Sequence, residues 1–295
     1  MVTRKRMTTY QKLLQDIRRQ FLSTWSSSAH LEALELVCFG GGMSREEFYR
    51  DGSQCVPPET EERIRALAAR HLDGDPVAYL IGEWEFYGLT LEVTPAVLIP
   101  RADTEVLAEA AIEFAQALGN CRLLDLCTGS GCIGLAVAAN VPECRALLGD
   151  VSGEALGVCR RNIRRCGLAD RVTADALDAL VPPPPSIGAF DCITCNPPYI
   201  TRAEMETLDR SVRDFEPHLA LCGGEDGLDF YRAVARHWRA ALARDGRMYF
   251  EVGIGQTDAV RQLMRREGFG DTNILPDTRG IGRVVYGTIL SEART

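Results

Sequence analysis

The sequence lacks the long apolar runs that mark membrane spans and leader peptides. No stretch approaches the roughly 18 consecutive apolar residues of a membrane-spanning helix. The basic residues Arg4, Lys5 and Arg6 resemble the start of a secretory signal, but no apolar run follows them. We therefore expect a cytoplasmic protein with no membrane partner.

Paired cysteine spacings are missing as well. The 11 cysteines are an odd number without a repeated spacing, and they form no metal-ligand pattern with the 4 histidines. Cys192 and Cys195 form a C-x-x-C, but residues 190–195 are typical of a strand, where residues three apart point to opposite faces. The sequence predicts free thiols in a reducing compartment and no metal site.

The chain also has no excess of basic residues. It carries 41 acidic and 33 basic side chains, for a formal net charge of −8. A protein that binds nucleic acid along its surface clusters Lys and Arg there, so we expect no direct nucleic-acid partner. With 46% hydrophobic residues and a length of 295, the chain can bury a core and is long enough for two domains.

The N-terminal part of the chain is predicted to be helical. Apolar residues recur at helical spacing over residues 8–22 and 59–73, and Leu31, Leu34 and Val37 indicate a helix that ends near Gly40. We expect a small helical bundle over residues 1–75. Such a bundle is either a structural cap or a module that docks a partner.

The rest of the chain changes its pattern twice. Short β-type runs on either side of Gly88 predict a hairpin within residues 76–100 that links two domains. Residues 101–295 then alternate helices and strands, which is typical of a parallel α/β sheet. Strands are expected at 122–127, 145–150, 171–174, 190–195, 247–252, 272–275 and 283–289, and helices at 103–118, 132–140, 154–166, 229–243 and 257–267.

The first of these strands leads into a glycine-containing turn at residues 127–131 and then a helix. Glycines let a ligand approach the backbone, and a helix N-terminus offers free N–H groups, so the turn suits an adenosine cofactor. Asp150 ends the next strand, where a carboxylate can accept hydrogen bonds from ribose hydroxyls or cap a helix. Asp175 ends the third strand and either reaches the adenine amino group or serves as a capping or turn residue. Because no arginine follows Asp150 in a position that suggests a 2′-phosphate, and because the turn departs from G-x-G-x-x-G, S-adenosylmethionine is favoured over a nicotinamide cofactor.

Asn196-Pro197-Pro198-Tyr199 follows the strand at 190–195, at the edge of the sheet where ligands bind. The prolines stiffen the backbone and remove donors. The Asn196 side-chain oxygen and the Pro197 carbonyl can then accept both hydrogens of a planar NH2 group and aim its lone pair at a sulfonium methyl. Those bonds strengthen as the nitrogen becomes tetrahedral. Tyr199 offers a flat face for stacking. The alternative is a proline-rich turn with a capping asparagine.

These residues together resemble the HemK-type (PrmC) family of release-factor glutamine methyltransferases over nearly the whole chain. The resemblance implies a Rossmann-like class I S-adenosylmethionine-dependent methyltransferase sheet with a small N-terminal helical domain. It also implies methylation of the side-chain amide nitrogen (N5) of the glutamine in the Gly-Gly-Gln motif of peptide chain release factors, with S-adenosylhomocysteine as product. The shared landmarks are Asp73 to Leu80, Ile99 to Glu105, Asp125 to Gly131, Asn196 to Tyr199, Phe215 to Pro217 and Asp277 to Val284.

The resemblance further assigns roles to single residues. It makes Asn196, Pro197 and Tyr199 catalytic, gives Pro198 a share in substrate binding, and implies that the N-terminal bundle docks the release factor. The chain departs from the family at Cys127, Ala102 and Ala176, where glycine, proline and an aromatic residue are common. The residues expected to bind S-adenosylmethionine are Asp125, Cys127, Thr128, Gly129, Ser130, Gly131, Asp150, Asp175, Ala176 and Asn196.

Three other functions remain open from the sequence. Enzymes that methylate an exocyclic amine of DNA or RNA share the Asn-Pro-Pro-Tyr motif, but they need base flipping and a basic channel. A related enzyme methylates a glutamine of a ribosomal protein, although residues 100–105 resemble the release-factor branch better. A non-catalytic binding module that retains the fold is the third alternative.

Overall fold

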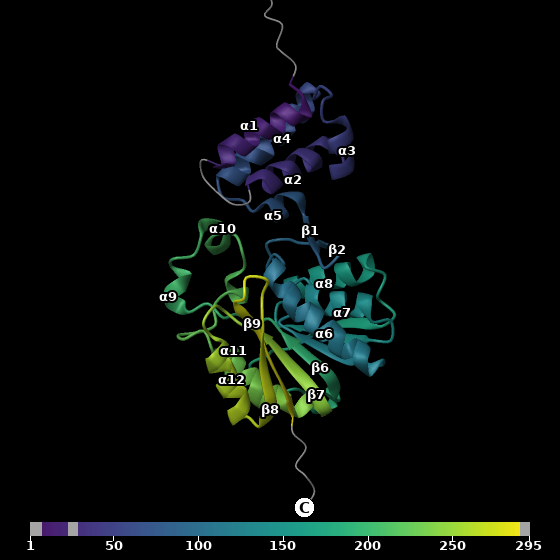
Figure 1. Ribbon diagram of the computed structural model, residues 1–295, viewed down its shortest axis with the longest axis vertical. Coiled ribbons are helices and arrows are strands. Elements are labelled where there is room, and N and C mark those ends of the chain that lie inside the picture. The colour runs from purple at the N-terminus through teal and green to yellow at the C-terminus, as the bar shows by residue number, and fades with distance from the viewer. Residues whose placement is uncertain (1–7, 23–28, 290–295) are drawn as a thin grey trace, which may run out of the picture. The chain divides into compact units, whose positions relative to one another are not determined.

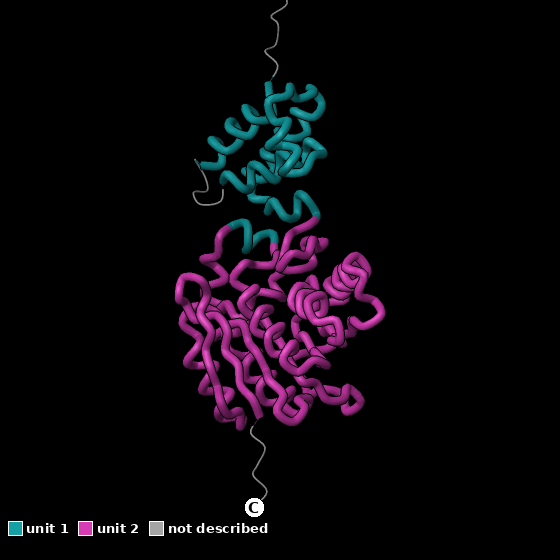
Figure 2. The backbone as a smooth tube through the Cα atoms, turned by 45° about the vertical axis from the view of Figure 1, so that its right-hand side comes forward, with its two compact units in different colours: residues 1–82, 210–215 teal, residues 83–209, 216–295 magenta. Residues whose placement is uncertain are grey.

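The computed structural model describes residues 8–22 and 29–289, so Arg4, Lys5 and Arg6 lie outside the described residues. The chain divides into two compact units, which Figure 2 colours separately. Unit 1 comprises residues 1–82 and 210–215, and unit 2 comprises residues 83–209 and 216–295. No helix in the described part of the chain is both long and apolar enough to cross a membrane.

Unit 1 is built from helices, as the N-terminal pattern predicts. Leu13, Ile17, Phe21 and Ile64 are almost fully buried in it. Two helices of this unit, α3 (Arg45–Asp51) and α5 (Val77–Ile81), were not predicted. A capping box formed by Ser44 and Glu47 starts α3. Helix α5 occupies a segment for which only β-type structure was expected. The helices of unit 1 are α1 (Tyr10–Leu22), α2 (Ala29–Gly41), α3 (Arg45–Asp51), α4 (Pro58–Leu72), α5 (Val77–Ile81) and α10 (Arg210–Arg213).

Unit 2 begins with the predicted hairpin. Strands β1 (Glu83–Phe86) and β2 (Leu89–Glu92) pair antiparallel, and the turn between them places Tyr87 and Gly88 at φ 47° and 76°. Asn162 fixes the hairpin to the rest of the unit, since its side chain accepts from the Glu92 N–H at 2.7 Å and donates to the Glu92 carbonyl at 3.0 Å.

A seven-stranded sheet of order β5-β4-β3-β6-β7-β9-β8 forms the centre of unit 2. The strands from β5 to β7 run parallel, and β9 pairs antiparallel with both β7 and β8. The strand order reverses between β3 and β6, where a crevice opens beyond the carboxyl ends of the strands. The bounds are β3 (Arg122–Leu126), β4 (Arg145–Asp150), β5 (Val172–Ala176), β6 (Phe190–Cys195), β7 (Leu242–Glu251), β8 (Phe269–Pro276) and β9 (Gly282–Ile289).

Helices cover both faces of this sheet (Figure 1), which confirms the predicted α/β architecture. Helices α6 (Glu105–Leu118), α7 (Cys132–Asn140) and α8 (Gly153–Arg165) pack on one face, and α11 (Asp229–His237) and α12 (Thr257–Arg266) pack on the other. Cys192 belongs to the first apolar core and Cys195 to the second, so the two thiols point to opposite faces as expected. All 11 cysteines are free.

The helix predicted at 229–243 ends early. Helix α11 stops at His237, a 3-10 turn follows over Trp238–Ala241, and β7 starts at Leu242. The buried Trp238 indole donates to the Ala179 carbonyl at 3.1 Å, a tertiary contact that the helical pattern does not reveal. The remaining short elements are α9 (Arg202–Met205) and the 3-10 turns Ala102–Thr104, Pro185–Ile187 and His218–Ala220.

Candidate active site

A cavity of about 310 Å³ lies beyond the carboxyl ends of the strands, entirely within unit 2. Its size falls in the range of roughly 300–1,000 Å³ that small-molecule sites occupy. It is continuous from the loop after β3 to the loop after β6. The wall comprises residues 96–98, 100–101, 104, 127–130, 132–133, 150–152, 155, 177–180, 196, 198, 217, 219–220 and 230.

The loop after β3 bends through left-handed backbone conformations. Cys127, Gly129 and Gly131 have φ values of 56°, 54° and 87°. Gly131 precedes α7, and a Cβ there would lie 3.0 Å from the Cys159 sulfur and 3.1 Å from Leu135. Cys127 therefore adopts a backbone conformation that a glycine would adopt with less strain.

Asp125 lies beneath this loop rather than in the cavity wall. Its fully buried carboxylate accepts from the Thr128 hydroxyl at 2.5 Å, the Thr194 hydroxyl at 2.8 Å and the Gly134 N–H at 3.3 Å. Burial raises the pKa of Asp125 to about 6, against the lowering effect of these hydrogen bonds. Asp125 therefore holds the loop in shape from below.

Asp150 lines the cavity and ties the loop to the next strand. Its carboxylate accepts from the Gly129 N–H at 2.9 Å and from the Ser152 N–H at 2.9 Å. The cap of α8 is Ser152, whose hydroxyl accepts from the Ala155 N–H at 3.2 Å. Asp150 therefore lies in the cavity wall, and Ser152 rather than Asp150 caps α8.

Asp175 and Ala176 end β5 as predicted, but both are exposed and neither lines the cavity. The cavity wall is formed by the residues that follow them. Leu177, Ala179 and Leu180 give it an apolar surface, and the Asp178 carboxylate accepts from the Leu180 N–H at 2.8 Å. Proximity to the strand end was the only sequence signal for these wall residues.

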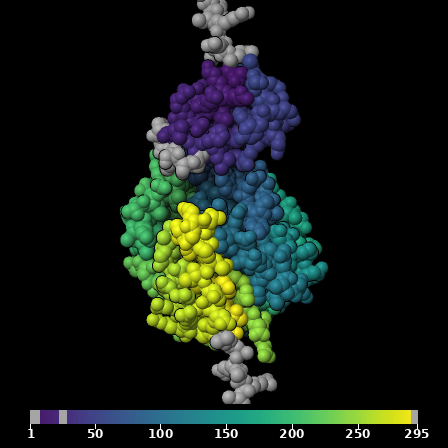
Figure 3. Space-filling view, viewed as in Figure 1, coloured from purple at the N-terminus to yellow at the C-terminus, as the bar shows by residue number. Residues whose placement is uncertain are grey.

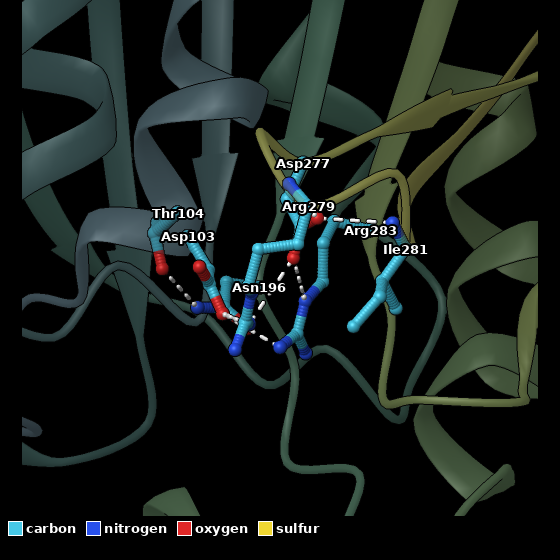
Figure 4. A network of polar contacts seen from close by, with 7 residues as sticks. All are labelled: Asp103, Thr104, Asn196, Asp277, Arg279, Ile281 and Arg283. Carbon is cyan, nitrogen blue, oxygen red and sulfur yellow. Dashed lines mark hydrogen bonds and ion pairs between the residues drawn. The ribbon is translucent and has the colours of Figure 1, made fainter.

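The loop after β6 brings Asn196 and Pro198 to the cavity. The Asn196 Nδ2 donates to the Thr104 hydroxyl at 3.5 Å (Figure 4). Pro197 is buried, and Tyr199 is half-buried outside the cavity wall, near Gly253. Burial raises the pKa of Tyr199 to about 12.

Contacts from distant segments hold this second loop. The Gln256 amide donates to the Tyr199 carbonyl at 3.1 Å and accepts from the Gly253 N–H at 3.0 Å. Gly223 packs so closely that a Cβ there would lie 2.6 Å from the Pro198 oxygen and 2.8 Å from the Tyr199 Cα. Gln256 and Gly223 were not predicted, because their role depends on the fold rather than on local pattern.

Three sequence landmarks that are far apart in the chain meet here: Ile99 to Glu105, Asn196 to Tyr199 and Asp277 to Val284. Asp103 accepts from Arg283 at 2.6 Å and from Arg279 at 3.1 Å (Figure 4). Hydrogen bonds from Ile281 N–H and from Arg279 lower the pKa of Asp277 to about 2. Figure 3 shows the C-terminal hairpin in yellow beside the blue segment that leads into α6.

A third arginine in this region, Arg101, is paired with the buried Glu216, which also accepts from the Ile99 N–H at 3.3 Å. Arg101, Arg279 and Arg283 thus each contact a carboxylate. Two further polar residues of this region, Thr104 and Glu251, are each 2% exposed. Thr104 lies within the landmark from Ile99 to Glu105, but neither residue was given a role from the sequence.

Comparison with known proteins agrees with this geometry. Residues 12–82 match the family model described as the PrmC N-terminal domain, and residues 104–223 match the methyltransferase small domain. The chain is 37% identical to the release factor glutamine methyltransferase of Geobacter sulfurreducens over 289 residues, covering 98% of this chain and 100% of that protein. The protein of that name from Bordetella pertussis is 38% identical, covering 87% of this chain and 94% of that one.

Solved structures share the fold at low sequence identity. A crystal structure of the hMettl16 catalytic domain in complex with a 3'UTR hairpin has a TM-score of 0.58 at 14% identity, and the match covers 88% of this chain and 92% of that chain. At that identity the likeness concerns the fold alone, which is that of a methyltransferase catalytic domain.

Proposed function

Because the chain belongs to the family of release factor glutamine methyltransferases, we propose that its cavity is where a methyl group passes from S-adenosylmethionine to the side-chain amide nitrogen of the glutamine in a release factor's Gly-Gly-Gln motif. The chain uses S-adenosylmethionine as its methyl donor. One observation carries the assignment of the site: the loops after β3 and β6 line the same cavity.

The residues of the first loop fit S-adenosylmethionine. Asp150 offers a carboxylate for the ribose diol, and the absence of a side chain at Gly129, where a Cβ would meet nothing within 4 Å, leaves space for close approach. Leu177, Ala179 and Leu180 give a flat base an apolar surface. When bound, S-adenosylmethionine supplies a methyl group carried by a positively charged sulfur. The roles expected for Asp175 and Ala176 stay predictions.

The residues of the second loop suit a planar NH2 group. The Asn196 Oδ1 and the Pro197 carbonyl accept its two hydrogens, and the prolines keep these acceptors stiff. An amide nitrogen is a weak nucleophile because its lone pair is delocalised, so orientation matters more than a strong base. Hydrogen bonds to the two hydrogens strengthen as positive charge develops on nitrogen. Stacking of the substrate on Tyr199 stays a prediction.

The charge around the site favours a protein substrate without direct nucleic-acid binding. A basic channel for phosphates needs cations that are free to bind them. Arg101, Arg279 and Arg283 are instead each paired with an acid. Since release factors act in translation, we place the reaction in the cytoplasm. We divide the chain into an N-terminal bundle (1–75), a hairpin linker (76–100) and a catalytic domain (101–295). Docking of the release factor is assigned to the N-terminal bundle.

A competition experiment tests this function. The protein is incubated with radiolabelled S-adenosylmethionine and equal amounts of a purified release factor, ribosomal proteins, duplex DNA and RNA. We expect label on the release factor only, removed when the glutamine of its Gly-Gly-Gln motif is replaced by alanine. Label on nucleic acid or on a ribosomal protein, with the release factor unlabelled, would reject the substrate assignment.

A further inference from the structure

The side-chain amide of Asn196 can present either of two groups to the cavity. Its oxygen is an acceptor and its NH2 is a donor, and a rotation of the amide by half a turn exchanges them. Only the oxygen can bind a hydrogen of the target NH2 group, so the proposed function requires a device that fixes the amide in one orientation.

Thr104 is the residue that contacts the other end of this amide. Its hydroxyl oxygen lies 3.5 Å from the Asn196 Nδ2, and the residue is 2% exposed. A hydroxyl carries one hydrogen. If that hydrogen is directed elsewhere, the Thr104 oxygen is left as an acceptor, and it can then bind only the NH2 end of Asn196.

Glu251 is a buried acid that can accept the Thr104 hydrogen. Glu251 is the last residue of β7. Cys195 of β6 pairs with Phe250 of β7, and Asn196 and Glu251 are the residues that directly follow this pair. The Glu251 side chain is almost fully buried, its Oε2 has no hydrogen-bond partner among the described residues, and the Thr104 side chain lowers the pKa of its carboxyl group. The chain Glu251, Thr104, Asn196 therefore has a direction of donation when Glu251 is ionised.

We propose that Thr104 and Glu251 are positioning residues that turn the Asn196 oxygen toward the substrate NH2 group. Ionised Glu251 accepts from Thr104, Thr104 accepts from Asn196 Nδ2, and Asn196 Oδ1 faces the cavity. The inference rests on the proposed function, since an acceptor at this point is needed only for a target that carries hydrogens on nitrogen.

The charged surroundings of Glu251 keep it close to the point of titration. Burial raises the pKa of Glu251 to about 7, and Asp103 acts in the same direction, while Thr104, Arg283 and Arg101 oppose them. The phenol groups of Tyr199 and Tyr231 and the thiol of Cys132 also lie near it. The Tyr231 hydroxyl donates to the Glu251 backbone carbonyl at 2.9 Å rather than to the carboxylate.

Protonation of Glu251 reverses the direction of donation. A neutral carboxyl donates its hydrogen to Thr104, and Thr104 can then donate to the Asn196 oxygen, which turns the NH2 group toward the substrate. Glu251 is ionised above its pKa and protonated below it, so kcat is expected to fall as the pH drops through about 7. Asp125 titrates at a lower pH, with a pKa of about 6.

Two matched substitutions test the Thr104 contact. Thr104→Val keeps the shape and removes the hydroxyl, and it is expected to lower kcat on a release factor by about tenfold or more, the effect of one lost orienting hydrogen bond. The KM for the factor and the Kd for S-adenosylmethionine should stay within about twofold, since the contact orients rather than binds. Thr104→Ser restores the hydroxyl and should recover most of the lost kcat.

Glu251→Gln supplies a second readout, which does not depend on whether the Thr104→Val variant folds. Its carbonyl oxygen still accepts from Thr104 but does not titrate, so the decline of kcat near pH 7 seen in the unchanged protein should disappear. A Gln variant that keeps the decline, or Val and Ser variants with equal kcat, would overturn the inference while the proposed function stands. No labelling of the release factor by the unchanged protein would overturn both.

Discussion

The loop after β3 and the loop after β6 lie at the same edge of one sheet, yet they are held in different ways. The residues that contact the first loop directly are near it in the chain: Asp125 accepts from the Thr128 hydroxyl at 2.5 Å, and Asp150 accepts from the Gly129 N–H at 2.9 Å. The remote Thr194 acts one step away, by donating to Asp125. The second is held by remote residues, since Gln256 is 57 positions from Tyr199 and Thr104 is 92 from Asn196. We infer that the loop after β3 binds the cofactor and that the remote contacts of the loop after β6 orient the group that is methylated.

The largest expected effect separates these two tasks. Asn196→Ala removes the side-chain acceptor and should lower kcat by about 10²–10³-fold, the usual effect of losing one group that stabilises developing charge. Titration calorimetry with S-adenosylmethionine should give a Kd within about threefold of the unchanged protein, because the first loop is intact. Comparable losses in both measurements would break the division between the loops.

Moving the second loop without touching its side chains should come next in size. Gly223→Ala puts a Cβ 2.6 Å from the Pro198 oxygen and 2.8 Å from the Tyr199 Cα, so the loop must shift. A displacement of this kind costs up to about 10²-fold in kcat. Gly153→Ala is the matched control, because a Cβ there meets nothing within 4 Å. Equal kcat values for the two variants would show that the loop needs no such support.

A change in the first loop should act on binding instead. Asp150→Ala removes a carboxylate from the cavity wall and leaves the Gly129 N–H without its acceptor. A hydrogen bond to a charged group contributes about 1.5–3 kcal/mol, so the Kd for S-adenosylmethionine should rise about 10- to 100-fold. At saturating cofactor, kcat should recover to within a few-fold. A kcat that stays low at saturation would mean that Asp150 also affects the chemistry.

The smallest effect concerns the backbone of the first loop. Cys127 has φ 56°, a conformation that costs a residue with a side chain about 1 kcal/mol. Cys127→Gly relieves this cost, although the more flexible unfolded chain offsets part of it, so the free energy of unfolding should rise by about 0.5 kcal/mol. Urea denaturation measures the change. A destabilised glycine variant would show that the Cys127 side chain contributes more through packing than it costs in strain.

The same contrast explains what the sequence could predict. The turn at residues 127–131, Asp150 and the Asn196 loop follow strands with strong apolar patterns, so their placement at one sheet edge follows from parallel topology. The helical N-terminus and the β1–β2 hairpin were likewise predicted from periodicity and turn residues, and the structure confirms both.

The contacts of the second loop could not be predicted in this way. The roles of Gln256 and Gly223 arise because the loop after β7 and the segment after Leu221 pack beside Tyr199, which no local pattern encodes. Glu251 had a weak signal, an acidic residue within the apolar run from Met248 to Val252. Helix α5 was missed because its five residues are too few to show a helical period.

Fragmentation mass spectrometry of a release factor, after incubation with the protein and S-adenosylmethionine, tests the central claim most directly. A site that pins the two hydrogens of a planar NH2 group predicts a single added methyl, located on the side-chain nitrogen of the Gly-Gly-Gln glutamine. A methyl on an oxygen or on a backbone amide would contradict that claim, because neither offers two hydrogens to Asn196 and Pro197. A methyl on a different residue type would contradict the assignment of the glutamine as the substrate.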